Sequence, residues 1–183
     1  VFEVKWDGYR AVAEVAGGDV VLNSRNLRAL NERFPAIAEA LRDLDVDAVL
    51  DGEIVVLDDR GRPDFQRLQH YGASRAGRLV YCVFDLLHLD GRDLTGLTLA
   101  RRKELLEKIL PRSPEVRFSD HVRGEGRLFF EAARKQGLEG IMAKQSQSRY
   151  QPGVRSRQWL KVKTRLTQDA VIAGFTEPRS TRK

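Results

Sequence analysis

The sequence predicts an α+β fold in which antiparallel sheets are flanked by helices. Gly17-Gly18 stands between two short apolar stretches, residues 12–16 and 20–22, which is a strong hairpin signal. Residues 78–87 are apolar at nearly every position, as in a strand buried on both faces. An amphipathic helix is indicated by apolar residues that recur at steps of three and four, namely Phe34, Ile37, Leu41 and Leu44.

The composition is that of an ordinary soluble globular protein. The chain has 183 residues, of which 42% are hydrophobic and 32% charged, enough for one core or for one domain and the start of another. It has no initiating Met, no cationic segment leading into an apolar one, and no long uncharged apolar run. We therefore expect a fragment with neither a signal peptide nor a membrane-spanning helix. The single Cys82 excludes an internal disulfide and is consistent with a reducing compartment.

The positive charge is concentrated near one end of the sequence. Of the 32 Lys and Arg and 26 Asp and Glu, residues 1–154 hold 24 of each, which balances. Residues 155–183 hold the remaining 8 basic and 2 acidic residues and so carry the whole net charge of +6. A basic segment on a neutral body indicates a polyanionic partner such as nucleic acid or nucleotide phosphates. The alternative is a solvated tail.

The first residues place a lysine at the junction of two strands. Residues 1–4 alternate around Glu3, residues 11–15 resume as a strand, and Gly8 permits a sharp turn between them. A lysine amine is a nucleophile only when neutral, which near pH 7 costs roughly 4–5 kcal/mol unless the site shifts its pKa. Neighbours that fix Lys5 in place could provide such a site. The alternative is a solvated turn lysine beside an incidental Asp7–Arg10 ion pair.

The chain continues through elements with clear boundary signals. Residues 23–26 are polar and exposed at a strand end, and Pro35 suits the first turn of the helix that follows. Residues 46–50 and 54–57 are predicted strands on either side of Asp51-Gly52-Glu53. Asp64 is expected to cap a short helix that runs through Gln69.

The second half alternates between strands and helices. Asp85 interrupts the apolar strand 78–87 and needs a partner there. Thr98 is expected to cap a helix over residues 100–110, and a further helix over 125–136 should end at Gly137. Residues 169–175 are a last apolar strand.

Two short strands in this half carry unusual charges. Glu139 and Lys144 stand at the two ends of an apolar strand, and residues 159–163 alternate so that Lys161 and Lys163 share one face. Two like charges on one face repel each other unless an anion lies opposite. An edge-strand pair that discourages aggregation is the alternative interpretation.

Together these residues form one chemical set. Glu53 and Glu139 could hold a hard divalent cation such as Mg²⁺, which takes one or two carboxylates together with substrate phosphate oxygens. Lys161 and Lys163 could hold a phosphate beside the Lys5 amine. The sequence has no glycine-rich loop ending in Lys-Ser or Lys-Thr, so a P-loop hydrolase is not indicated.

The order of these residues resembles that of the covalent nucleotidyltransferases, which are DNA ligases, RNA ligases and mRNA capping enzymes. Six of the family's motifs follow one another across nearly the whole chain, which makes the resemblance specific. They are Lys5-x-Asp7-Gly8-x-Arg10, Ser24-Arg25, Asp51-Gly52-Glu53, Tyr81-Cys82-Val83-Phe84-Asp85, Glu139-Gly140-Ile141-Met142-Ala143-Lys144 and Trp159-Leu160-Lys161-Val162-Lys163.

Within this family the pattern is most similar to an ATP-dependent DNA ligase of the bacterial ligase D type. The resemblance implies a nucleotidyltransferase (ATP-grasp-like) adenylation domain over residues 1–166, truncated at its N-terminus, and the first strand of a truncated OB-fold domain in residues 167–183. It implies ATP, with AMP as a covalent adduct, and Mg²⁺ or Mn²⁺. It also implies nicked or broken duplex DNA as substrate in end-joining repair, with Ku and fused polymerase and phosphoesterase domains as partners. The expected location is the bacterial cytoplasm, at the nucleoid.

The resemblance also implies a role for each matching residue. Lys5 attacks the α-phosphate of ATP and becomes linked to AMP. AMP then passes to a DNA 5′-phosphate, and the 3′-OH displaces it to seal the nick. Asp7 serves these two later steps. Glu3 matches the residue that reads the adenine amino group, and Phe84 the aromatic that stacks on the base. The other nucleotide-binding positions are Val4, Arg10, Arg25, Glu53, Lys144, Lys161 and Lys163. The metal-binding positions are Glu53 and Glu139.

Other functions fit parts of the sequence. An RNA ligase or an mRNA capping enzyme shares the lysine motif, although the last two motifs fit capping enzymes less well. A basic nucleic-acid-binding module without catalysis explains the charge asymmetry. That module does not explain why Lys5 stands in this loop.

Overall fold

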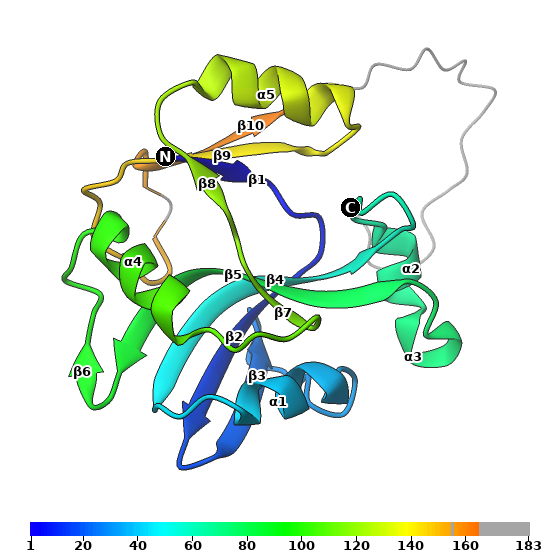
Figure 1. Cartoon of the computed structure of the whole chain (residues 1–183), viewed down its shortest axis with the longest axis vertical. Coiled ribbons are helices and arrows are strands. Elements are labelled where there is room, and N and C mark those ends of the chain that lie inside the picture. The colour runs from blue at the N-terminus through cyan, green and yellow to red at the C-terminus, as the bar shows by residue number, and fades with distance from the viewer. Residues whose placement is uncertain (155, 165–183) are drawn as a thin grey trace, which may run out of the picture.

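The computed structural model describes residues 1–154 and 156–164, which form two β-sheets with helices packed against them (Figure 1). The smaller sheet has the strand order β10-β9-β1-β8, and the larger has β3-β2-β4-β5-β6 with β7 paired to β5. All of these pairings are antiparallel except that of β5 with β7, which confirms the predicted fold class. The strands are β1 (Phe2–Val4), β2 (Tyr9–Ala16), β3 (Asp19–Ser24), β4 (Ala48–Leu57), β5 (Arg78–Leu89), β6 (Arg92–Asp93), β7 (Val116–Phe118), β8 (His121–Val122), β9 (Gly140–Lys144) and β10 (Trp159–Lys163).

Helices cover the outer faces of both sheets. Helix α5 lies over the smaller sheet on the side away from the larger one (Figure 1), where Ala133 and Leu138 pack against Ile141 of β9. Helix α1 packs on the larger sheet through the predicted apolar positions, all of which are buried. The helices are α1 (Pro35–Arg42), α2 (Phe65–Gln69), α3 (Tyr71–Ser74), α4 (Leu99–Ile109) and α5 (Gly126–Lys135).

The predicted hairpin is confirmed by its backbone geometry. Gly17 and Gly18 join β2 to β3 with φ values of 57° and 86°. Both values lie in the left-handed region that a two-residue hairpin turn of this kind requires, and glycine reaches that region without strain. Helix α5 ends just before Gly137, as expected from the sequence.

The predicted helix caps and the partner of Asp85 are also confirmed. Asp64 accepts a hydrogen bond from a backbone amide of α2 at 3.0 Å, and Thr98 accepts one from α4 at 3.4 Å. Asp85 is fully buried, and its partner is the fully buried Arg102 of α4. The charge that interrupts an apolar strand is therefore neutralised inside the core.

The predicted break at residues 51–53 is wrong. Asp51-Gly52-Glu53 lies inside one continuous strand, β4, which pairs with β2 on one side and β5 on the other. Register shifts beside residues 49–50 and 51–52 let the strand bend without ending. Gly52 is needed for packing, since a Cβ there would lie 2.6 Å from the Tyr81 ring.

Two predictions fall outside the described residues. The strand over residues 169–175 and the domain boundary between residues 166 and 167 belong to the part of the chain that the structure does not describe. Over residues 1–154 and 156–164, none of the helices has the length and hydrophobicity that a membrane crossing requires.

Candidate active site

The loop that carries Lys5 joins the two sheets. It leaves β1 of the smaller sheet and enters β2 of the larger one (Figure 1). The Lys5 amide donates a hydrogen bond to the Gly140 carbonyl at 3.0 Å, which holds the loop against β9. At the other end, a Cβ on Gly8 would lie 2.1 Å from the Ile54 carbonyl oxygen. Glycine is therefore required here by close packing against β4, and the backbone of the Lys5 loop is held at both ends.

A cavity of about 620 Å³ lies where the two sheets meet at this loop. Strands of both sheets and the segment after β3 contribute to its wall. Most of the predicted site residues are among those that line it, namely Glu3, Val4, Lys5, Arg10, Arg25, Glu53, Phe84, Lys144 and Lys161. A volume of this size is typical of small-molecule sites.

Three other predicted residues lie beside Lys5 without lining the cavity. Glu139 forms an ion pair with the Lys5 amine, and its other oxygen lies 3.2 Å from Lys163 Nζ. Burial alone would raise the pKa of Glu139, but its hydrogen bonds to Lys5 and Lys163 lower it. Partial burial and the neighbouring Glu139 carboxylate raise the pKa of Asp7. The sequence predicts an anion opposite Lys161 and Lys163. For Lys163 that anion is Glu139, whereas Lys161 lines the cavity.

One end of the cavity is built from aromatic rings and a buried ion pair. Phe84 and Trp159 meet edge to face with their ring centroids 6.4 Å apart. The Lys144 ammonium lies 4.3 Å and 4.2 Å from these two centroids and donates to Glu3 at 2.8 Å. Glu3 is only 1% exposed, and the pKa of this carboxyl is lowered by Lys144 and Lys103 against the opposing effect of burial.

Arg10 projects from β2 into a network of its own. Its guanidinium donates two hydrogen bonds to the fully buried Asp51, at 3.0 and 2.6 Å. The Tyr150 hydroxyl donates to Asp51 at 2.8 Å. These bonds raise the pKa of Arg10 and hold its side chain at the cavity edge, 5.7 Å from the Phe84 centroid. The alternative Asp7–Arg10 ion pair is therefore wrong, because Arg10 is bound to Asp51.

Glu53 of β4 lines the cavity from the larger sheet. Burial raises the pKa of this carboxyl to about 7, against the lowering effect of Arg10 and Lys5. A nearby cation would favour the ionised form of this carboxyl and so oppose the effect of burial on its pKa. Among residues 1–154 and 156–164 there is no cluster of three or more His, Cys, Asp and Glu side chains placed to hold a metal ion. Of the two predicted metal-binding residues, Glu53 lines the cavity, whereas Glu139 lies beside it and is paired with Lys5 and Lys163.

Several residues of the site were not predicted. Trp159 and Met142 line the cavity, although the sequence marked them only as parts of strands. Tyr150 supports Arg10 from a loop in which no pattern marks it. Arg28 and Arg33 also line the cavity, and the only signal for them in the sequence was that they follow the polar segment 23–26.

Comparisons with known proteins place the chain in a family. Residues 1–163 match the family described as ATP dependent DNA ligase domain. The chain is 43% identical over 95% of its length to the multifunctional non-homologous end joining DNA repair protein LigD of Mycobacterium tuberculosis. It is 40% identical over its whole length to the multifunctional non-homologous end joining protein LigD of Pseudomonas aeruginosa. The chain spans 23% and 22% of these two relatives, which is less than a quarter of each.

A solved structure supports the same relationship. Mycobacterial DNA ligase D complexed with ATP and MES aligns with 88% of this chain and 53% of that one, with a TM-score of 0.77 and 40% identity. The nucleotidyltransferase fold expected from the motifs is thereby confirmed. Because the family match covers nearly all of the sequence, this chain belongs to the ATP-dependent DNA ligase domain family.

Proposed function

We propose that this chain is the adenylation domain of an ATP-dependent DNA ligase and that Lys5 carries AMP. The observation that supports it is the position of Lys5, whose side chain lines the cavity at the junction of the two sheets. Phe84 and Glu3 offer an aromatic surface and a carboxylate at one end of this cavity, and Lys161 offers a cation for phosphate. The ATP bound to the mycobacterial relative supports ATP as the nucleotide.

The first step is attack by the Lys5 Nζ on the α-phosphorus of ATP. The ammonium first gives up one proton to solvent. The neutral amine then forms the N–P bond as the bond to the bridging oxygen breaks and pyrophosphate leaves, and the new nitrogen gives up its second proton to solvent. Glu139 forms an ion pair with the Lys5 amine and so helps to hold it in place. Lys161 stabilises the charge that develops on the α-phosphate in the transition state. Val4, Arg10, Arg25, Lys144 and Lys163 complete the nucleotide site in this proposal.

Glu53 and Glu139 are the residues that would hold Mg²⁺ or Mn²⁺. Their hard oxygen donors suit either ion. When bound, such a cation neutralises phosphate charge in the reaction. Glu53 lines the cavity and Glu139 pairs with Lys5 beside it, which supports their place in this site.

We extend the proposal to the later steps and to the setting in which they occur. The names of the relatives support end joining in DNA repair as the process, and we take nicked or broken duplex DNA as the substrate. AMP would pass from Lys5 to a DNA 5′-phosphate, with Asp7 serving this step and the sealing step. Residues 1–166 would form the adenylation domain and residues 167–183 the start of an OB-fold domain. Ku and fused polymerase and phosphoesterase domains would be its partners in the bacterial cytoplasm.

The test is intact mass spectrometry after incubation with Mg²⁺ and ATP. We expect a covalent AMP adduct on the wild-type chain and none on Lys5→Ala or Lys5→Arg, because alanine has no amine and guanidinium stays protonated. Circular dichroism should show that both variants are folded, since Lys5 is local to one loop. An adduct that persists on Lys5→Ala would reject the assignment. Stable absence of an adduct on the wild type, with DNA still bound, would favour the noncatalytic module.

A second incubation separates the enzyme classes. The adenylated chain is mixed with a nicked DNA duplex or with the matching nicked RNA, and the 5′ ends are analysed for AMP. We expect AMP on the DNA end. Preferential transfer to RNA would identify an RNA ligase, and an adduct formed from GTP in place of ATP would identify a capping-type enzyme.

A further inference from the structure

Two adjacent cations of α4 point into the protein interior. Arg102 is fully buried and Lys103 is 2% exposed, whereas Arg101 and Glu104 on either side are exposed. A buried cation is unfavourable unless it is paired and hydrogen-bonded. The partners of these two side chains therefore indicate what the helix holds in place.

Lys103 contacts residues that line the cavity but does not line it itself. Its Nζ lies 3.0 Å from Glu3 Oε1 and donates to the backbone carbonyls of Ser119 at 3.1 Å and Phe84 at 3.4 Å. The other Glu3 oxygen accepts from Lys144 at 2.8 Å. Glu3, Phe84 and Lys144 line the cavity but Lys103 does not. The Glu3 carboxylate is thus held between one lysine on the cavity side and one lysine beneath it.

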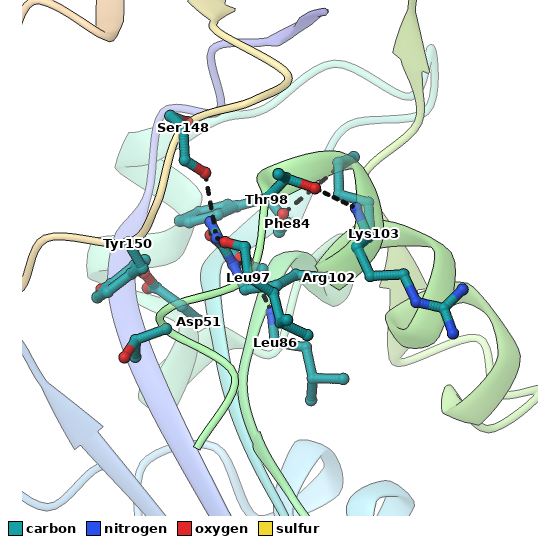
Figure 2. Close-up of polar contacts among 12 residues, drawn as sticks. Asp51, Phe84, Leu86, Leu97, Thr98, Arg102, Lys103, Ser148 and Tyr150 are labelled. Atoms are coloured by element: carbon teal, nitrogen blue, oxygen red, sulfur yellow. Dashed lines mark hydrogen bonds and ion pairs between the residues drawn. The ribbon is translucent and has the colours of Figure 1, made fainter. Parts of the chain in front are cut away.

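Arg102 anchors the adjoining backbone. It donates two hydrogen bonds to Asp85, the residue after Phe84, at 2.7 and 2.8 Å. Figure 2 shows Arg102 reaching from α4 toward Leu97 and Ser148, whose carbonyls accept at 2.6 and 3.3 Å. These bonds hold α4 directly beneath the strand that carries Phe84.

We propose that Lys103 is a positioning residue for recognition of the base, with Arg102 as the anchor that keeps α4 in place. This inference rests on the proposed function, because it takes the nucleotide base to lie at the Glu3–Phe84 end of the cavity. The ligand class is a purine nucleoside triphosphate with an exocyclic amino group, which a carboxylate accepts from. Lys103 touches no substrate and acts by orienting Glu3.

If Lys103 served only to pack the core, its replacement would change the stability of the protein but not its preference between bases. Replacing Lys103 alone removes one partner of a buried ion pair, and such a change destabilises the fold whether or not the residue positions Glu3. Glu3 would still have Lys144 as a partner of opposite charge. A change in base preference, rather than in stability, therefore distinguishes positioning from packing.

The experiment measures equilibrium binding of ATP and of inosine triphosphate by calorimetry in EDTA, where no metal-dependent adenylation competes. Inosine carries a carbonyl where adenosine carries the amino group. We expect the wild type to prefer ATP and Lys103→Met to lose about tenfold of that preference, the value of one hydrogen bond to a charged group. The ratio of the two dissociation constants cancels any inactive fraction of the sample. Lys103→Gln, which keeps donors for the carbonyls but removes the charge, provides the same comparison if the methionine variant does not fold.

Leu106→Ala is the matched control. Leu106 is fully buried on the same helix and does not line the cavity, so this variant should be less stable with an unchanged base preference. An unchanged preference in the Lys103 variants would overturn the inference, as would a wild type that binds both nucleotides equally. A lost preference in a chain that never forms the AMP adduct would uphold the inference and reject the proposed function.

Discussion

At the scale of single residues, the two lysines of β10 have different surroundings although they share a face. Lys161 lines the cavity, whereas Lys163 is 63% exposed and lies 3.2 Å from Glu139. Exposed ion pairs contribute little, and a cation aimed at a developing charge contributes much more. The alternation of the strand could not distinguish the two, because it places both side chains alike.

Lys161→Ala should therefore slow formation of the AMP adduct by about 10²–10³. The KM for ATP should change less than the rate, since the interaction is strongest in the transition state. Lys163→Ala should change the rate by less than tenfold. Single-turnover adenylation, measured by quenched flow, checks both variants, and a wild-type rate in Lys161→Ala would contradict this assignment.

The buried Glu3 makes a contribution to stability that depends on pH. Its pKa in the folded protein is lowered by Lys144 and Lys103, so its ionised form stabilises the fold above the unfolded pKa of about 4.5. That contribution is lost as the pH falls below this value. Glu3→Gln should lower the free energy of unfolding by roughly 3–5 kcal/mol at pH 7, because two buried lysines lose their anion.

The difference between wild type and Glu3→Gln should shrink as the pH falls below about 4.5. Urea unfolding at a series of pH values measures it. Glu14→Gln, an exposed position on β2, serves as the control and should match the wild type throughout. A difference that stays constant down to pH 3 would show that the charge of Glu3 is not the source of its effect.

At the scale of elements, the β1–β2 loop is held by its contact with β4. Gly8 lies so close to the Ile54 carbonyl that any side chain would displace backbone. The loop cannot move away easily, because the Lys5 amide is bonded to Gly140 of the other sheet. Strand β4 thus sets the position of the nucleophile from within the larger sheet.

Gly8→Ala should destabilise the protein by at least the 1–3 kcal/mol typical of overpacking. It should also reduce formation of the AMP adduct in molecules that remain folded, since the loop must shift. Gly96→Ala is the matched control, because a Cβ at Gly96 meets nothing within 4 Å. Chemical denaturation and adduct yield per folded molecule measure the two effects. Equal behaviour of both variants would mean that the loop accommodates a side chain.

Strand β5 also protects its cysteine. Cys82 is 1% exposed, and burial raises the pKa of its thiol to about 12. Only the thiolate reacts with alkylating reagents, so native protein at pH 8 should resist iodoacetamide for hours. Denatured protein should react within minutes. Rapid labelling of the native chain would show that β5 opens locally.

At the scale of the whole molecule, the cavity joins the two sheets into one binding unit. Glu3 and Lys161 come from the smaller sheet, and Arg10, Glu53 and Phe84 come from the larger. A ligand that contacts both sheets stabilises both against unfolding. The charged network around Arg102 spans the same junction, since it joins Asp85 of the larger sheet to the segment before β10.

ATP should therefore raise the melting temperature of the whole chain in a single transition. At 100 times its dissociation constant, a ligand contributes about 2.7 kcal/mol of stability. Calorimetric scans with ATP in EDTA measure the shift, and Phe84→Ala should reduce it by weakening base stacking. Two transitions, of which ATP shifts only one, would show that the sheets unfold independently.

The local elements could be predicted from the sequence because their signals are local. The Gly17-Gly18 hairpin, the caps at Asp64 and Thr98 and the apolar face of α1 each depend on residues a few positions apart. The charge of Asp85 likewise demanded a buried partner, whatever its identity. The family was predicted from the order and spacing of six motifs, which the sequence displays directly.

Tertiary structure alone decided which charges meet. The residues of each ion pair are far apart in the sequence. The separation is 134 positions for Lys5 and Glu139, 41 for Arg10 and Asp51, and 100 (103 minus 3) for Lys103 and Glu3. No local periodicity encodes such pairs, because they form only when two sheets pack around one cavity. The continuity of β4 through Asp51-Gly52-Glu53 has the same origin, since strands on both sides satisfy its backbone where the sequence alone indicated two separate strands.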